Sequence, residues 1–239
     1  HPKVQEYDLK SVKACISGSA PLPMDVQEKF GQITGGRLVE GFGMTEASPV
    51  THCNPIYGTR KNGSIGIPLP DTEAKIIDLE TGADLPIGGE QQGELCVRGP
   101  QVMRGYWNRP DETAKVMFGD WLRTGDIGRI DQAGFVFIED RKKDMILVSG
   151  FNVYPNEVES VIAAHPGVLE VAAVAQPDEK SGEVVAIFVV KKDPQLTEQA
   201  LIDFAREQMT GYKVPRHVYF RNELPKTNVG KILRRALRD

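Results

Sequence analysis

Two segments far apart in the sequence carry side chains suited to chemistry on a nucleotide. The first is residues 41–46 (GFGMTE) and the second is residues 225–231 (PKTNVGK). Glycines let a ligand approach the backbone, a threonine hydroxyl can contact a phosphate oxygen, and a glutamate carboxylate can hold a hard cation such as Mg²⁺. A nucleotide bound there would need a cation at its reacting centre, and the terminal Lys231 could supply one. Together the two segments suggest ATP chemistry.

Residues 41–46 also have a plain structural interpretation. They could form only a tight turn after a strand at residues 37–40, because short glycine motifs are common. Residues 17–21 form a similar turn at the end of a strand. This turn would line the nucleotide pocket on a second side. The candidate residues of the two turns are Gly18, Ser19, Ala20, Gly41, Phe42, Gly43, Thr45 and Glu46.

Lys231 follows a glycine, but the segment around it is not a Walker phosphate loop. Pro225 occupies the place of the first glycine of such a loop, so contact with phosphate has to come from the Lys231 side chain. An ammonium about 4 Å from a developing negative charge is worth on the order of 4 kcal/mol at an effective dielectric constant of about 20. Residues 232–238 are expected to form a basic C-terminal helix whose arginines offset its dipole or are solvated.

Three further stretches are candidates for ligand contacts. Asp126 follows a Thr-Gly pair, where its carboxylate could accept hydrogen bonds from both hydroxyls of a ribose, and an Asx turn is the structural alternative. Charged runs such as residues 140–144 are mostly solvated, but this one lies where the sequence pattern changes. A residue there could act as a hinge while Arg141 reaches the ribose or the phosphates. The glycine turn of Ser149, Gly150 and Phe151 could admit a narrow ligand such as a pantetheine arm, or simply connect a strand to a helix.

The pattern that positions these residues changes twice along the chain. Residues 1–60 read as strand, glycine turn and helix, which is typical of an α/β sheet with ligand loops at its strand ends. Residues 61–140 contain short strands between prolines and glycines, which favours a small antiparallel β barrel or sandwich. The rest, residues 143–239, is predicted to be an α+β module. The predicted fold class is therefore α/β and α+β multidomain, with a boundary near residues 141–143.

Composition and charge narrow the class of protein. With 239 residues, of which 40% are hydrophobic and 26% charged, the chain can form one large or two modest folded domains. A net charge of −4 argues against a general nucleic-acid binder. The 3 cysteines lack the spacing of a zinc site, and an odd number does not suit a disulfide framework, so a cytoplasmic location is expected. No run approaches the roughly 18 apolar residues of a membrane span.

In order along the chain, five segments resemble those of the adenylate-forming superfamily, and closely resemble its bacterial long-chain fatty-acid–CoA ligases. They are residues 40–46, 93–100, 121–126, 140–155 and 225–231. The resemblance covers essentially the whole chain and implies a reaction in two steps. A fatty-acid carboxylate attacks the α-phosphorus of ATP, which gives acyl-AMP and pyrophosphate, and the thiol of CoA then displaces AMP. It also implies a mobile C-terminal lid (residues 143–239) on a large AMP-binding domain that includes residues 1–142.

The resemblance also implies roles for the candidate residues. Glu46 would hold Mg²⁺, Thr45 a phosphate oxygen, Phe42 with residues 18–20 the adenine, and Asp126 with Arg141 the ribose. Lys231 would bridge the carboxylate and the α-phosphate, where an electrostatic donor is worth about 100- to 1,000-fold in rate. Lys143 matches the hinge position, and rotation there would carry Lys231 away and bring residues 149–151 toward CoA.

One element of the superfamily is absent, because the chain has no Ser/Thr/Gly-rich phosphate loop upstream of residue 41. The chain also begins with His-Pro and soon enters a predicted strand. We therefore expect the C-terminal part of a longer ligase that cannot make acyl-AMP by itself.

Other interpretations stay open on the sequence alone. The nearest are an aryl-CoA ligase and a peptide-synthetase adenylation domain, although residues 140–154 favour the fatty-acyl branch. A non-catalytic nucleotide-binding module would keep residues 41–46 but would not need Lys231. An RNA-binding tail at residues 226–238 is disfavoured by the acidic total. Transient peripheral contact with a membrane is compatible with a long-chain fatty acid, which partitions into bilayers.

Overall fold

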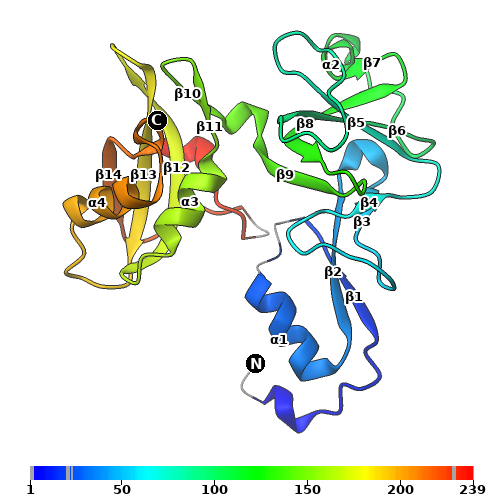
Figure 1. Ribbon diagram of the computed structural model, residues 1–239, viewed down its shortest axis with the longest axis horizontal. Helices are drawn as coiled ribbons and strands as arrows, with labels where there is room; N and C mark the ends of the chain where they lie inside the picture. Colours follow the sequence, from blue (N-terminus) through cyan, green and yellow to red (C-terminus); the bar gives the residue numbers. More distant parts are fainter. Residues whose placement is uncertain (1–2, 20–21, 23, 228–229, 239) are drawn as a thin grey trace. The chain divides into compact units, whose positions relative to one another are not determined.

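The chain folds into two compact units, His1–Ile138 and Glu139–Asp239 (Figure 1). The computed structural model describes residues 3–19, 22, 24–227 and 230–238. The first unit contains an α/β segment and a separate antiparallel sheet, and the second unit is an α+β module. The predicted fold class is therefore confirmed. The predicted hinge at Lys143 concerns a motion and stays a prediction.

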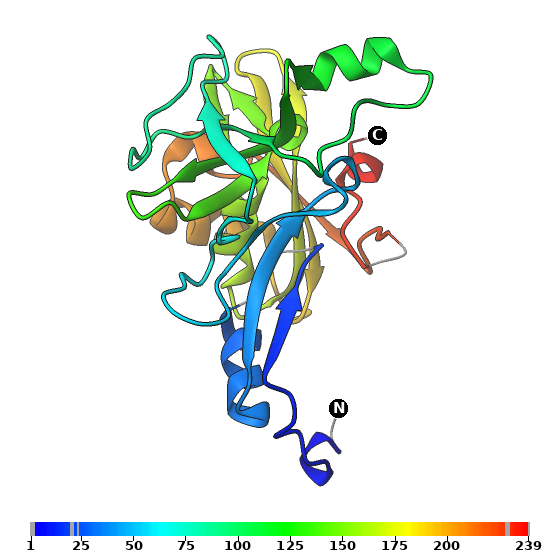
Figure 2. The same cartoon turned by 90° about the vertical axis from the view of Figure 1, so that its right-hand side faces the viewer.

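The first sheet has the order β1-β2-β3-β4. β1 (Ala14–Ser17) and β2 (Arg37–Gly43) are parallel, so a crossover has to join them, and α1 (Met24–Thr34) provides it. Figure 2 shows the two strands side by side with α1 next to them. β3 (Val50–Cys53) and β4 (Ile67–Pro68) continue the sheet in antiparallel pairs.

Residues 41–43 belong to β2, which corrects the expectation of a turn directly after residue 40. The strand continues because its other neighbour, β3, pairs with it further along, with Gly41 opposite Cys53 and Phe42 opposite His52. The turn comes later, at the 3-10 helix η2 (Thr45–Ala47). A Cβ atom on Gly43 would lie 1.8 Å from the carbonyl oxygen of Pro49, so the return of the chain into β3 requires glycine at this position.

The second sheet contains the short strands expected between residues 61 and 140. Its order is β5-β6-β8-β7, with β9 also paired to β8, and this path does not return to β5, so the sheet is a half-barrel. Alternate side chains point inward and form one apolar core. The elements are β5 (Glu73–Ile77), β6 (Gly93–Arg98), α2 (Pro110–Val116), β7 (Met117–Phe118), β8 (Trp121–Ile130) and β9 (Val136–Arg141).

The second unit is built on a five-stranded sheet whose two faces are both covered. The order is β11-β10-β13-β12, and β14 pairs in parallel with β13. α3 and α4 cover one face, and Leu224, Ile232 and Leu237 contribute to the core on the other. The strands are β10 (Ile146–Val148), β11 (Phe151–Val153), β12 (Val168–Asp178), β13 (Gly182–Lys191) and β14 (His217–Arg221), and the helices are α3 (Pro155–Ala163) and α4 (Glu198–Gln208).

Thr197 caps the start of α4, because its side chain accepts a hydrogen bond from the N–H of Ala200 at 3.2 Å. α1 and α4 are 11 residues long. Within the described parts of the chain, no helix has both the length and the apolar character required to cross a membrane.

The expected C-terminal helix over residues 232–238 is wrong. Only a short 3-10 helix, η5 (Arg234–Leu237), forms there. Ile232 instead makes a β-bridge to Lys226, and Leu237 is buried in the core on the second face of the sheet. Tertiary packing of these two apolar residues therefore overrides the local helical preference.

Candidate functional site

The first unit brings the two predicted glycine turns together. Ser17 of β1 lies opposite Glu40 of β2, so Gly18 and Gly41 are neighbours at the same end of the parallel pair. A Cβ atom on Gly18 would lie 3.3 Å from the carbonyl oxygen of Gly41. Gly18 and Ser19 are exposed, and Ser19 has φ 71°, a left-handed conformation typical of a tight turn. Ala20 lies outside the described residues.

Glu46 is held by two hydrogen bonds from a distant loop. Its backbone carbonyl accepts from the N–H of Met103 at 2.7 Å, and its Oε1 accepts from the hydroxyl of Tyr106 at 2.8 Å. Thr45 in the same turn is exposed, whereas Glu46 is half-buried. The turn itself is closed by the N–H of Met44, which donates to the carbonyl of Pro49 at 2.7 Å. The candidate carboxylate therefore has a defined position.

Sequence analysis missed Tyr106, which lies 60 residues from Glu46 along the chain. Burial and the hydrogen bond to the Glu46 carboxylate raise the pKa of the Tyr106 hydroxyl to about 12. The phenol therefore keeps its proton at neutral pH and acts as the donor. No short-range signal links the two residues, because their contact forms only when the α2 loop folds back onto η2.

Phe42 and His52 lie opposite each other on β2 and β3. Their rings make an edge contact with 6.1 Å between centroids, and Phe42 also packs against the core of the half-barrel. His52 is fully buried, with its Nδ1 2.9 Å from the hydroxyl of Thr51. Burial lowers the pKa of His52 to about 4, so its ring is neutral at physiological pH. His52 is therefore a core residue that supports the Phe42 strand.

Asp126 lies in a bulge of β8 and is 3% exposed. Its N–H donates to the hydroxyl of Thr124 at 3.1 Å. The carboxylate of Glu94 fixes this bulge, accepting from the N–H of Gly125 at 3.2 Å and from Nε of Arg123 at 3.0 Å. Glu94 is itself only 4% exposed. No local sequence pattern connects Glu94 with the position of Asp126.

In the second unit, the charged run 140–144 is more than a solvated linker. Asp140 is 1% exposed and accepts hydrogen bonds from the N–H groups of Arg141 and Asn156, both at 2.7 Å. Burial raises the pKa of the Asp140 carboxyl, and these two N–H donors oppose the rise. Asp140 therefore tethers the start of α3, while the side chains of Arg141 and Lys143 are exposed.

Lys231 projects from a hairpin whose described arms are residues 225–227 and 230–233. The N–H of Thr227 donates to the carbonyl of Lys231 at 2.7 Å, and the N–H of Leu233 donates to the carbonyl of Pro225 at 2.8 Å. Gly230 has φ 81°, which favours glycine at that turn position. The Lys231 side chain is exposed. Asn228 and Val229 lie outside the described residues.

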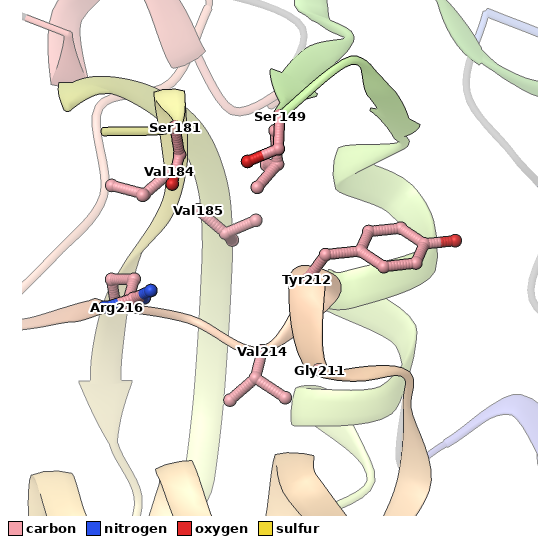
Figure 3. A pocket seen from close by; sticks show the side chains of 9 residues that line it. Ser149, Ser181, Val184, Val185, Gly211, Tyr212, Val214 and Arg216 are labelled. Atoms are coloured by element: carbon pink, nitrogen blue, oxygen red, sulfur yellow. The ribbon is translucent and has the colours of Figure 1, made fainter. Parts of the chain in front are cut away.

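The turn between β10 and β11 also matches a predicted ligand segment. Ser149 and Gly150 both have positive φ values, 51° and 86°, and the exposed ring of Phe151 stacks on Tyr212 with 4.8 Å between centroids. Ser149 borders a cavity of about 220 Å³, with Tyr212 and Val214 on the other side (Figure 3). The cavity is lined by Val148, Ser149, Ser181, Val184, Val185, Gly211, Tyr212, Val214 and Arg216.

Two family models match the chain. The model of the AMP-binding enzyme matches residues 1–107, and that of the AMP-binding enzyme C-terminal domain matches residues 157–231. The chain belongs to the AMP-binding enzymes. The two matched regions fall in the two structural units, so each unit corresponds to a different part of an AMP-binding enzyme.

Curated relatives cover nearly all of the chain. A long-chain-fatty-acid–CoA ligase of Escherichia coli O157:H7 is 56% identical over 98% of this AMP-binding chain, and one of Bacillus subtilis (strain 168) is 53% identical over 99%. The chain spans 41% and 42% of the lengths of these two relatives. A 4-coumarate-CoA ligase of Narcissus pseudonarcissus is 41% identical over the whole chain.

Solved structures of AMP-binding enzymes share the fold. ATP-bound MatB from Rhodopseudomonas palustris matches 93% of this chain and 44% of its own length, with a TM-score of 0.86 and 39% identity. MenE, the o-succinylbenzoate CoA synthetase of Bacillus subtilis, was solved with its acyl-adenylate intermediate and matches 100% of this chain and 49% of its own length. Its TM-score is 0.85 and its identity 31%.

Proposed function

We propose that this chain is the C-terminal part of an AMP-forming long-chain fatty-acid–CoA ligase. The observation that carries the proposal is the 56% and 53% identity to two bacterial long-chain-fatty-acid–CoA ligases over almost the whole chain. The complete enzyme would convert a fatty acid, ATP and CoA into acyl-CoA, AMP and pyrophosphate, through an acyl-AMP intermediate.

The first unit would bind the nucleotide. Adjacent backbones at Gly18 and Gly41 leave room for a flat base beside the end of the parallel strands, where ligands of α/β sheets commonly bind. At this end of the strands, residues 18–20, Gly43 and Phe42 would contact the adenine, Thr45 a phosphate oxygen, and buried Asp126 the ribose hydroxyls. The arrangement supports these assignments because it fixes Asp126 and the Thr45 turn through hydrogen bonds of their own.

Glu46 fits a magnesium ligand. Among the described residues no group of three or more potential ligand side chains could enclose a metal. Mg²⁺ suits a site with a single protein carboxylate, because it usually keeps several waters and is bound through one or two carboxylates plus substrate phosphates. Tyr106 holds one carboxylate oxygen of Glu46, which orients the other. When bound, Mg²⁺ would neutralise charge on the phosphates of ATP.

The second unit would supply one group for the adenylation step and another for transfer of the acyl group to CoA. Lys231 on its hairpin would stabilise negative charge as the fatty-acid carboxylate attacks the α-phosphorus, and the bond to pyrophosphate breaks. After rotation about Lys143, with Arg141 also reaching the ribose, the turn of Ser149, Gly150 and Phe151 would face the CoA thiol. The stacked ring of Phe151 and the adjoining cavity, which Arg216 helps to line, support CoA as its ligand.

The fatty-acyl substrate is favoured over an aryl acid. The 4-coumarate-CoA ligase is 41% identical to the chain, clearly less than the fatty-acid ligases. We further propose a cytoplasmic enzyme with peripheral membrane contact, because its long-chain substrate partitions into bilayers. Flotation of the full-length protein with liposomes checks that contact.

Pyrophosphate release tests the proposal directly. The full-length protein should release pyrophosphate with a long-chain fatty acid, ATP and Mg²⁺, and should form acyl-CoA when CoA is added. The 239-residue chain alone should release none, because it lacks the upstream phosphate loop. Turnover by the isolated chain that depends on Lys231 would contradict the proposed division of the site.

A further inference from the structure

Arg234 lies in a polar cluster that joins three parts of the second unit. Its guanidinium forms a two-pronged pair with Glu159 of α3, at 2.9 and 2.7 Å, and donates to Oδ1 of Asn156 at 2.6 Å. The carboxylates of Asp140 and Asp144 lie 3.8 and 3.7 Å away. The Arg234 side chain is 17% exposed. Because it contacts four such partners, Arg234 holds these parts of the unit together and is not a solvated surface charge.

The partners of Arg234 are themselves fixed to the fold. Oε1 of Glu159 also accepts from the N–H of Ala173 in β12 at 2.8 Å, which ties the cluster to the sheet. Asp144 is shared with a second arginine, because Arg238 donates to its Oδ1 at 2.8 Å. Arg238 also donates to the carbonyl of Lys143 at 3.4 Å. Two arginines therefore connect the C-terminal segment to the segment that contains Lys143.

The same two arginines directly follow the Lys231 hairpin. Its outgoing arm is held by an ion pair between Lys226 and Glu170 of β12. Its returning arm leads through Leu233, whose N–H donates to the carbonyl of Pro225, into Arg234. The exposed Lys231 therefore extends from a hairpin that is anchored on both sides, and the Arg234 anchor reaches residues 140–144.

We propose that Arg234 and Arg238 couple residues 140–144 to the Lys231 hairpin and thereby fix the position of Lys231 relative to this segment. Arg234 is then a positioning residue for the adenylation step. This inference rests on the proposed role of Lys231. Arginine is required because its planar fork bonds Glu159 with two donors while it faces two further carboxylates, which a lysine ammonium cannot do.

Hydrogen exchange and half-reaction kinetics on the full-length protein test the coupling. In Arg234→Lys, amides of residues 140–146 and 225–233 should exchange hydrogen about 10-fold faster. Local opening of this region costs less free energy there, because it no longer has to break the contacts of the Arg234 guanidinium. The adenylation kcat should fall roughly 10- to 100-fold, because Lys231 is misplaced. The KM for ATP and acyl transfer from preformed acyl-AMP to CoA should change little. Arg235→Lys, at the exposed neighbouring arginine, is the matched control and should change none of these.

A second variant protects the test against simple misfolding. Asp144→Asn removes the shared carboxylate but leaves the pair between Arg234 and Glu159, and it should accelerate exchange in the same two segments. Unchanged exchange at residues 140–146 in both variants, or an unchanged adenylation kcat in Arg234→Lys, would overturn the coupling. Full adenylation in Lys231→Ala with the exchange effects intact would instead refute the proposed function and leave the mechanical link standing.

Discussion

The hydroxyl of Tyr106 lies 2.8 Å from Oε1 of Glu46 and donates a hydrogen bond to it. Because the high pKa of Tyr106 keeps the phenol protonated, one carboxylate oxygen is always engaged and the carboxylate plane is fixed. The loop that precedes α2 therefore shapes the proposed magnesium site, although it contributes no metal ligand of its own.

Loss of this hydroxyl should weaken the magnesium site. In full-length Tyr106→Phe, the Mg²⁺ concentration for half-maximal pyrophosphate release should rise roughly 10-fold, as is usual when a partner of a metal ligand is removed. Tyr57→Phe, at a tyrosine that is 75% exposed, is the control. An unchanged Mg²⁺ requirement in Tyr106→Phe would show that the bond does not orient the ligand.

The buried neutral His52 should make the first unit less stable in acid. Its pKa is lowered from 6.5 to about 4, so below pH 6.5 the unfolded chain takes up a proton that the folded unit refuses until about pH 4. The free energy of unfolding should therefore fall across this window, by at most about 3 kcal/mol. Urea unfolding followed by fluorescence reports on this unit, because Trp107 and Trp121 are the only tryptophans.

Comparison of two variants with the parent separates the contribution of His52 to the pH dependence of stability from that of other groups. His52→Gln should be less stable at pH 7 but should lose less stability than the parent between pH 7 and pH 4.5. His217→Gln, at an exposed histidine of the second unit, should keep the parental pH dependence. An identical fall in His52→Gln and the parent would assign the acid sensitivity to other groups.

Two glycine-to-alanine substitutions should have opposite effects on stability. Gly43→Ala would place a Cβ atom 1.8 Å from the carbonyl oxygen of Pro49, and this overlap should cost about 1–3 kcal/mol or more. Gly31→Ala lies inside α1, where the new Cβ atom would be an ordinary 3.7 Å from the carbonyl of Gly36. It should be neutral or stabilise by roughly 0.5–1 kcal/mol. Chemical denaturation of the two variants measures the sign and size of each change in the free energy of unfolding.

The buried Glu94 should matter far more than an exposed carboxylate in the same sheet. Glu94→Gln breaks the pair with Arg123 and should destabilise the first unit by about 3–5 kcal/mol. It should also weaken ATP binding by the full-length protein, because the bulge that carries Asp126 loses its acceptor. Glu73→Gln, in an exposed pair with Arg98, should cost at most about 1 kcal/mol. Equal losses in the two variants would contradict this account.

Local patterns allowed the sequence to predict most of the elements but not their limits. Prolines and glycines between short runs predicted the strands of residues 61–140, and the strand predicted at residues 37–40 forms the first part of β2. β2 extended three residues beyond the predicted end because β3, a non-local partner, pairs with Gly41 and Phe42. The C-terminal helix failed for a similar reason, since Ile232 and Leu237 make tertiary contacts that a helix would not allow.

In the candidate site, too, local features could be predicted from the sequence and long-range contacts could not. Motifs pointed to Glu46, Asp126 and Lys231 because their residue types and neighbouring glycines are local features. Tyr106 and Glu94 support the first two through contacts that span 60 and 31 residues, and no local pattern encodes such contacts. For Arg234 the sequence predicts only a charge that offsets a helix dipole or is solvated, because its four partners converge only when α3 and the C-terminal segment meet.

Separate measurement of the two half-reactions in the full-length Lys231→Ala variant tests the central claim most directly. Pyrophosphate release that depends on fatty acid should fall about 100- to 1,000-fold, because the cation at the α-phosphate is lost. Formation of acyl-CoA from preformed acyl-AMP should stay close to the parental rate, and Lys192→Ala should be unaffected in both steps. Equal loss of both half-reactions, or no loss of either, would contradict the assignment of Lys231 to the first step.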